Sequence, residues 1–264
     1  FEVATFYHHF EVVRGDEAAP GLTVRVCEGL SCELAGAKQL LDKLPALLGS
    51  PDVRVIAAPC VGRCEQAPVA VVHQNAVTHA TPEKVVATVK AKATQQALPD
   101  YVDMAAYVAD GGYALAASLS EGGTNADEVL QAMEASGLRG LGGAGFPTGR
   151  KWRIVREQPA PRVMAVNIDE GEPGTFKDRH YLERDPHRFL EGMLIAAQVV
   201  GIDAIYIYLR DEYHACRVLL QQALQDLKAN PPCALPHIEL RRGAGAYICG
   251  EESAMIESIE GKRG

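Results

Sequence analysis

The feature that most constrains this chain is a glycine-rich run from Gly140 to Trp152, with the sequence GLGGAGFPTGRKW. Five glycines within ten positions remove side chains from a loop, so its backbone can approach a ligand closely and adopt positive φ. Backbone N–H groups exposed in this way commonly bind a phosphate or a flat cofactor. The run ends in two cations and an aromatic ring, Arg150, Lys151 and Trp152. It therefore predicts a nucleotide or flavin site rather than a plain turn.

The run contains a G-x-G-x-x-G pattern at Gly140, Gly142 and Gly145, but its context argues against an ordinary Rossmann fingerprint. That fingerprint requires a strand before the glycines and a helix that opens from them. Here residues 125–138 have apolar side chains at helical spacing after a capping Asn125, which predicts a helix before the glycines. We therefore expect a different glycine-rich cradle.

Composition and charge argue against several classes of protein. The 264 residues suffice for one or two domains, and the formal net charge of −8 argues on electrostatic grounds against a general binder of nucleic acid or anionic membrane. No apolar run approaches the roughly 20 residues of a membrane span, and no signal peptide is evident. We therefore expect a cytoplasmic protein, in which seven cysteines argue against a disulfide framework.

The hydrophobic pattern predicts two α/β modules. In the first, strands are expected over 23–26 and 53–58, a hairpin over 69–72 and 76–78, and helices over 34–48 and 81–93. This order suits a thioredoxin-like fold. Residues 94–124 are expected to form a linker. In the second module, strands are expected over 162–166, 204–209 and 238–240, and helices over 186–200 and 212–228. This alternation predicts a mostly parallel sheet covered on both faces.

Four of the seven cysteines form two close pairs, Cys27-x4-Cys32 and Cys60-x3-Cys64, each at the end of a predicted strand. Four thiolates suit zinc or a [2Fe–2S] cluster. Zinc knuckles usually favour C-x2-C, so the wider spacing favours iron and sulfur. Two alternatives remain: four ordinary thiols, or a fold that persists after its cluster has been lost. The eight histidines show no ligand spacing, and none is assigned a role.

An acidic loop, Asn167–Arg179, follows the strand at 162–166. It leaves the carboxyl end of that strand, where open α/β sheets place their ligands. Asn167 can both donate and accept hydrogen bonds, as the pyrimidine edge of a flavin requires. Three carboxylates crowd behind it, at a cost in free energy unless a ligand or cation uses them: Asp169, Glu170 and Glu172. The alternative is a solvated acidic turn. A third segment, Gly243–Ser253, again pairs glycines with an aromatic ring and two acids, and predicts a second wall of the same pocket.

Three motifs, Gly140–Trp152, Asn167–Arg179 and Tyr247–Glu252, resemble the FMN- and NADH-binding subunit of respiratory complex I. The same unit occurs in NAD-reducing hydrogenases and NAD-dependent formate dehydrogenases. Residues 1–93 resemble the thioredoxin-like [2Fe–2S] subunit of these enzymes, and Val3–Tyr7 resembles the end of its helical segment. The resemblance implies a thioredoxin-like ferredoxin domain (1–93), a linker (94–124) and a Rossmann-like but non-classical FMN-binding domain (125–264). The fusion most resembles the flavin subunit of an NAD-dependent formate dehydrogenase or the diaphorase subunit of a hydrogenase.

The resemblance also implies roles for individual residues. The residues expected to bind FMN are Gly140, Gly142, Gly143, Gly145, Lys151, Asn167, Asp169, Glu170, Tyr247, Gly250 and Glu251. Those expected to bind NAD(H) are Phe146, which stacks on the adenine, Glu172 and Glu252. The cluster ligands are Cys27, Cys32, Cys60 and Cys64. Hydride passes between the two cofactors, so no protein acid or base is required.

The expected function is an NAD(H):FMN electron-transfer module of a multisubunit dehydrogenase, with iron–sulfur and molybdenum or tungsten subunits as partners. Complex I, a hydrogenase diaphorase and a redox-silent assembly protein are the alternatives. Leu141 stands where the family often has arginine, which removes one cation. Phe1 resembles an internal position and Gly264 lies inside a familiar motif. A fragment is therefore expected, with a [4Fe–4S] cluster in the part that would follow.

Overall fold

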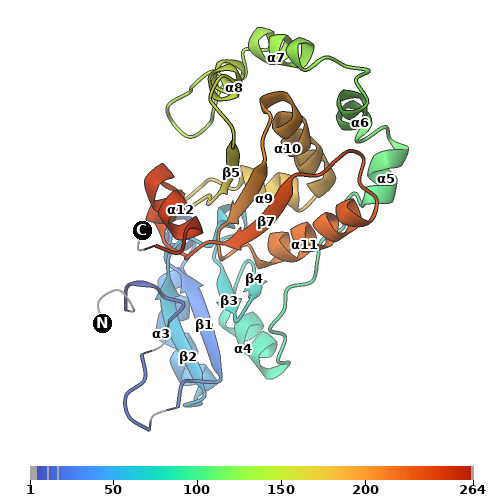
Figure 1. Cartoon of the computed structure of the whole chain (residues 1–264). Helices are drawn as coiled ribbons and strands as arrows, with labels where there is room; N and C mark the ends of the chain where they lie inside the picture. Colours follow the sequence, from blue (N-terminus) through green and yellow to red (C-terminus); the bar gives the residue numbers. More distant parts are fainter. Residues whose placement is uncertain (1–4, 11, 17, 263–264) are drawn as a thin grey trace.

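The computed structural model describes residues 5–10, 12–16 and 18–262, and contains two sheets in two modules (Figure 1). The helical end expected at Val3–Tyr7 lies partly outside the described residues. Among the described residues, none of the helices combines the length and the hydrophobicity that a membrane span needs.

The first module confirms the predicted thioredoxin-like fold. Its four-stranded sheet has the order β2-β1-β3-β4, in which β1 is parallel to β2 and antiparallel to β3. The strands are β1 (Leu22–Cys27), β2 (Val53–Ala58), β3 (Ala70–Val72) and β4 (Asn75–Val77). The helices are α2 (Leu30–Leu34), α3 (Ala37–Leu48) and α4 (Pro82–Lys90). Helix α4 begins as predicted, because the Thr81 hydroxyl accepts a hydrogen bond from the Lys84 N–H and Pro82 occupies the first turn.

The helix expected over 34–48 is present as α3, which begins three residues later at Ala37, and the short helix α2 precedes it. Gly36 lies between them with φ +96°, a left-handed conformation that glycine adopts without strain. From Ala37 onward the helix buries Leu40 and Leu44 against Val24 and Val26 of β1. The predicted hydrophobic stripe is therefore present on α3, and the start of the predicted helix was wrong because Gly36 separates it from the preceding turn.

Residues 94–124, expected to form a linker, contain two short helices, α5 (Met104–Ala109) and α6 (Ala114–Ser120). Tyr107, Tyr113 and Ala116 of this segment are buried in the core of the second module. Neither helix is long enough to show two full repeats of the helical pattern, which explains why periodicity did not reveal them.

The second module has a parallel sheet of order β5-β6-β7, formed by β5 (Val163–Ile168), β6 (Ala204–Leu209) and β7 (His237–Arg242). Helices α10 (Pro186–Val200) and α11 (His214–Ala229) connect the strands and belong with Ile205, Ile207 and Leu209 to one buried core. On the opposite face of the sheet, Met255 of α12 (Glu252–Ile259) packs in one buried cluster with Tyr208 of β6.

The expected coverage of both sheet faces is only partly realised. Val163 and Asn167 of β5 are exposed, so β5 leaves an open face beside the acidic loop. Helices α7 (Ala126–Ala135) and α8 (Thr148–Arg156) pack against each other and against α10, at the end of the module far from the first sheet (Figure 1).

The glycine-rich run joins α7 to α8. A helix precedes it as predicted, and the Asn125 side chain caps that helix by accepting a hydrogen bond from the Asp127 N–H. Gly143 (φ +93°) and Gly145 (φ +60°) adopt the expected positive φ. The loop is shorter than expected, because α8 begins at Thr148 and places the two cations and the tryptophan on a helix.

Candidate functional site

The two cysteine pairs meet at the carboxyl ends of β1 and β2. Cys27 is the last residue of β1 and lies in register with Ala58, the last residue of β2. Because the two strands are parallel neighbours, the loops that leave them converge at one edge of the sheet. Cys27, Cys32 and Cys60 are buried, and Cys64 is half-buried at the start of the short helix η1 (Cys64–Gln66).

The four thiols form a row of neighbours. The sulfurs of Cys60 and Cys64 are 3.4 Å apart, and the Cys27 thiol has the side chains of Cys32 and Cys60 as neighbours that influence its pKa. The neighbouring Cys27 thiol and burial raise the pKa of Cys60, so without a cation this thiol keeps its proton. A metal centre would stabilise the thiolates and displace these protons. Four soft sulfur donors packed along two converging loops fit a [2Fe–2S] cluster.

Gly29 lets the loop after β1 approach the second pair. A Cβ at this position would lie 3.2 Å from the Cβ of Cys60 and 3.4 Å from the sulfur of Cys27. Gly62 has a different requirement, since it adopts φ +69° and a Cβ there would collide with the ring of Tyr213 in the second module. The loop of the second pair is therefore shaped by the neighbouring module.

A cleft of about 740 Å³ opens beside the carboxyl end of β5, and segments of all three predicted motifs form its walls. Its lining residues are Leu141, Gly142, Gly143, Asn167, Asp169, Glu170, Glu172, Thr175, Lys177, Asp178, Tyr247, Ile248, Gly250 and Glu251. A volume of this size lies within the range of small-molecule and cofactor sites. Among the residues expected to bind cofactors, five do not line it: Gly140, Gly145, Phe146, Lys151 and Glu252.

Asn167 connects two segments that line the cleft, the acidic loop and the Gly243–Ser253 segment. Its Nδ2 donates to the Gly250 carbonyl at 2.8 Å, and its Oδ1 accepts from the Asp169 N–H at 3.0 Å. The side-chain amide keeps one further donor and one further acceptor position for a ligand. Gly250 is needed at this contact, because a Cβ there would lie 2.8 Å from the Asp169 carbonyl oxygen.

Asp169 carries a polar atom without a protein partner among the described residues. Its Oδ2 is buried and makes no hydrogen bond with them. Burial raises the pKa of Asp169 to about 7, against the opposing effect of the Arg210 cation. An orphaned buried oxygen is costly unless a ligand supplies a hydrogen bond. This atom therefore fits a cofactor that offers a donor to the cleft, as the ring N–H of a flavin does.

Glu170 is already engaged within the protein. Its carboxylate accepts hydrogen bonds from the backbone N–H groups of Asp178 (3.1 Å) and Arg179 (3.4 Å), at the start of α9 (Lys177–Leu182). The Tyr213 hydroxyl, which burial keeps protonated by raising its pKa, donates to the same carboxylate at 2.8 Å. Glu170 thus holds α9 and Tyr213 in place, a function that the sequence did not indicate.

Glu251 is likewise a helix cap. Its carboxylate accepts from the N–H groups of Ser253 and Ala254, each at 3.0 Å, at the first turn of α12. These hydrogen bonds, with that of the Ser253 hydroxyl first among them, lower the pKa of Glu251. A carboxylate in this position accepts hydrogen bonds from the free N–H groups of the first turn and interacts favourably with the positive end of the helix dipole.

Lys177 is a cleft residue that received no role from the sequence. Its ammonium lies 2.9 Å from the Asp178 carboxylate and 3.5 Å from that of Glu170. Because Lys151 does not line the cleft and Leu141 contributes no charge, Lys177 is the cation among the described lining residues. Its position as the first residue of α9 could have been found only by recognising that helix.

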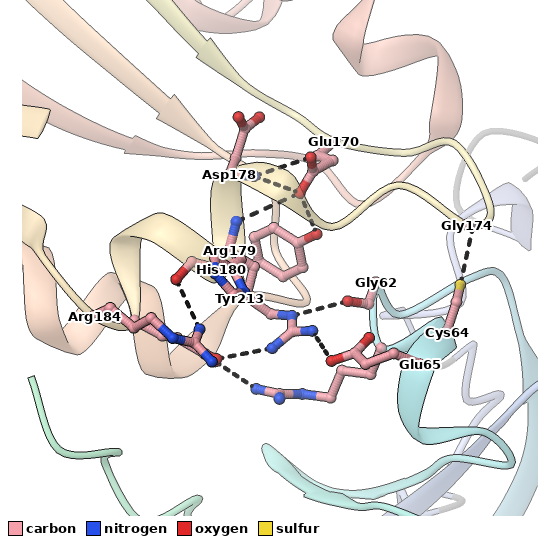
Figure 2. A network of polar contacts seen from close by, with 12 residues as sticks. Gly62, Cys64, Glu65, Glu170, Gly174, Asp178, Arg179, His180, Arg184 and Tyr213 are labelled. Carbon is pink, nitrogen blue, oxygen red and sulfur yellow. Dashed lines mark hydrogen bonds and ion pairs between the residues drawn. The ribbon is translucent and has the colours of Figure 1, made fainter.

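The acidic loop, called the flavin loop from here on, is in direct contact with the loop of the second cysteine pair, called the cysteine loop. The Gly174 N–H donates to the sulfur of Cys64 at 3.1 Å, and Arg179 donates to the Gly62 carbonyl at 2.9 Å (Figure 2). Arg179 also pairs with Glu183 and Glu65, and Glu183 pairs with Arg63 of the first module at 2.8 Å. The contacts join the predicted cluster site to the predicted flavin site.

A separate group of possible metal ligands lies between the modules. Ligand atoms of His8, His9 and Glu212 all lie within 4.8 Å of one another. The Glu212 carboxylate is already paired with the Arg210 guanidinium at 3.1 Å. That arginine competes with any cation for the carboxylate, so the cysteine row remains the better metal site in the part of the chain that the structure describes.

A glycine-lined cleft on a parallel sheet, joined to four converging thiols in a thioredoxin-like module, defines a flavoprotein with an attached iron–sulfur domain. Residues 133–264 match the family described as the Nuo51 FMN-binding domain, and residues 1–93 match the thioredoxin-like [2Fe-2S] ferredoxin family. The chain belongs to the Nuo51 FMN-binding domain family. FMN and a [2Fe–2S] cluster are therefore the cofactors of its two modules.

Relatives and solved structures agree with this assignment. The chain is 46% identical over 167 residues to an NADH-quinone oxidoreductase subunit of Aquifex aeolicus (strain VF5), a match that covers 60% of this chain and 38% of the relative. A second NADH-quinone oxidoreductase subunit, from Rhizobium meliloti (strain 1021), is 44% identical over 176 residues, with 63% and 41% covered. A crystal structure of NAD+-reducing [NiFe]-hydrogenase in the air-oxidised state superposes with a TM-score of 0.78 at 31% identity. That match covers 99% of this chain and 48% of the hydrogenase chain, so this chain spans less than half the length of each of these proteins.

Proposed function

We propose that this chain is an NAD(H):FMN electron-transfer module that passes electrons between NAD(H) and iron–sulfur clusters. The observation that carries the proposal is the hydrogen bond from Gly174, in the loop that lines the cleft, to the sulfur of Cys64 at 3.1 Å. It brings the loop of the flavin cleft into contact with a cluster ligand. The names of the relatives, which include NADH-quinone oxidoreductases and an NAD+-reducing hydrogenase, support NAD(H) as the second substrate of the cleft.

FMN, when bound, accepts a hydride from NADH and can release the two electrons singly. The residues of the chain then act by binding and orientation rather than as an acid or base. Asn167 and the orphaned oxygen of Asp169 would hold the flavin by hydrogen bonds, and Gly142 and Gly143 would leave room for the backbone to approach it. Gly140, Gly145 and Lys151 do not line the cleft, and we propose that they too would hold FMN, from the glycine-rich run and the helix that follows it.

For NAD(H), two exposed side chains are available on the segments whose other residues line the cleft. Phe146 is exposed, so its ring presents an aromatic surface on which the adenine can stack, beside the Arg150 guanidinium, which lies 5.7 Å from the ring centroid. Glu172 is exposed in the acidic loop, where its carboxylate can accept hydrogen bonds from ribose hydroxyls or the nicotinamide amide. Glu252 would add a second carboxylate from α12.

The test of this function is a purified complex with flavin absorption, bound iron and NADH–ferricyanide activity. Glu172→Ala should raise the KM for NADH about tenfold, because a hydrogen bond to a charged group contributes about 1.5–3 kcal/mol. Glu121→Ala, an exposed carboxylate at the end of α6, is the matched control and should leave KM unchanged. An unchanged KM in Glu172→Ala would contradict its assigned role.

We propose further that the electrons are exchanged with a formate-oxidising molybdenum or tungsten subunit in the cytoplasm. The fused architecture supports a partner other than complex I: the hydrogenase match covers 99% of this chain, both modules included, whereas the matches with the two NADH-quinone oxidoreductase relatives cover 60% and 63%. The same architecture suits a hydrogenase partner. Metal analysis of the intact complex distinguishes the candidates, because a formate dehydrogenase contains molybdenum or tungsten, a hydrogenase contains nickel, and complex I contains neither. A redox-silent assembly protein would lack both flavin and iron.

A further inference from the structure

The loop of the second cysteine pair is held by buried groups of the flavin-binding module. Arg210, which is 5% exposed, donates to the Cys60 carbonyl at 2.5 Å and also to the carbonyl of Glu170 in the flavin loop. Arg179, which is 3% exposed, donates to the Gly62 carbonyl at 2.9 Å. Two guanidinium cations therefore contact the backbone of this loop, one at the carbonyl of Cys60 and one at the carbonyl of Gly62, which lies between Cys60 and Cys64.

The charges around Arg179 are balanced. Its guanidinium pairs with Glu65 (Figure 2) and with Glu183 at 2.8 Å, and Glu183 in turn pairs with Arg63 at 2.8 Å. Two cations face two anions, and the side chains of Arg63, Arg179 and Glu183 are each less than a tenth exposed. Removal of one charged partner would leave an uncompensated charge beside the cysteine loop, where water screens it weakly.

We propose that Arg179 is a positioning residue that fixes the Cys60–Cys64 loop against the flavin loop and raises the reduction potential of the [2Fe–2S] cluster. The inference rests on the proposed function. One electron leaves the reduced flavin and enters the oxidised cluster, and no covalent bond forms or breaks. The cluster gains one negative charge, which a nearby cation stabilises more in the reduced than in the oxidised state. Charge and hydrogen bonds around the ligands are recognised determinants of cluster potential.

The sign of the effect distinguishes this role from a merely structural one. Arg179→Gln removes a cation and should lower the potential, whereas Glu65→Gln removes an anion from the same pair and should raise it. A loosened loop would shift both variants in the same direction. Arg188→Gln is the matched control, since this arginine lies on the neighbouring helix α10 with a side chain 71% exposed and pairs with Asp185.

The experiment is a redox titration of the intact complex, followed by the electron paramagnetic resonance signal of the reduced cluster. We expect Arg179→Gln to lower the reduction equilibrium constant about tenfold, which is about 59 mV for one electron. Glu65→Gln should shift it in the opposite direction, and Arg188→Gln should not shift it. In stopped-flow mixing with NADH, Arg179→Gln should reduce its flavin at the wild-type rate and its cluster more slowly.

Equal potentials in wild type and both variants, or shifts of one sign in both, would overturn the proposal. If Arg179→Gln assembles no cluster, Glu65→Gln and the charge-retaining Arg179→Lys decide the matter. Glu65→Gln must still raise the reduction potential of the cluster. Arg179→Lys must keep the wild-type potential while the cluster is reduced more slowly. A wild-type complex without flavin or cluster signals would instead refute the proposed function, so the two failures are distinguishable.

Discussion

The hydrogen bond between Tyr213 and Glu170 offers the sharpest test of how the flavin loop is held. The two side chains lie 43 residues apart in sequence and are both buried, with the Tyr213 hydroxyl 2.8 Å from the Glu170 carboxylate. Tyr213→Phe removes this one donor and keeps the ring that packs against Gly62. A hydrogen bond to a charged group contributes about 1.5–3 kcal/mol, and the carboxylate keeps its contacts with α9.

We therefore expect Tyr213→Phe to lower the free energy of unfolding by about 2 kcal/mol. For a chain of this size that is a fall in Tm of about 4 to 8 °C. The assay is thermal unfolding of the complex-bound and free protein, with FMN retention measured alongside. Tyr181→Phe, in which the tyrosine is 66% exposed on α9, is the control and should change Tm by less than about 1 °C. An equally small change in Tyr213→Phe would refute the idea that this contact secures the loop.

Three further predictions concern other parts of the two sites. Because burial raises the pKa of Asp169 to about 7, above its ordinary 3.8, this carboxyl should contribute stability to the flavin-free protein that is lost as pH rises from about 4 to about 7. In thermal unfolding at a series of pH values, the stability difference between wild type and Asp169→Asn should therefore change over this range, and a difference that does not depend on pH would refute the shift. Gly250→Ala should lower the free energy of unfolding by about 1–3 kcal/mol in urea and weaken FMN binding, because the new Cβ would meet the Asp169 carbonyl. Gly192→Ala on α10 is the control and should be neutral or stabilising, because the space around this glycine is open. Cys64→Ser should lose cluster iron and keep FMN, measured by metal analysis and absorption; full iron content would contradict its role as a ligand.

The convergence of the motifs could be predicted because it follows from strand order. Cys27 and Cys60 lie at the ends of parallel neighbours, and Asn167 lies at the end of β5, so their loops gather where parallel strands end. The spacing of Cys60 and Cys64 identified the pair without any knowledge of the fold. The positive φ of Gly143 followed from its residue type and its place in a glycine-rich loop.

The contacts that hold the acidic loop against α9, Tyr213 and the cysteine loop could not be predicted, because they join segments that are distant in sequence. Glu170 caps α9 and binds Tyr213, and neither partner is evident from the acidic loop. Arg179 belongs to the acidic loop but contacts Gly62, which lies 117 residues earlier. A helix of six residues such as α9 shows little periodicity, so the place of Lys177 at its start could not be recognised from sequence.

The most direct measurement is anaerobic addition of NADH to the intact complex, with absorption and electron paramagnetic resonance recorded together. Bleaching of a flavin band, followed by the signal of a reduced two-iron cluster that disappears in Cys64→Ser, is the predicted result. A preparation that holds neither flavin nor cluster, or a flavin that NADH leaves oxidised, would contradict the account.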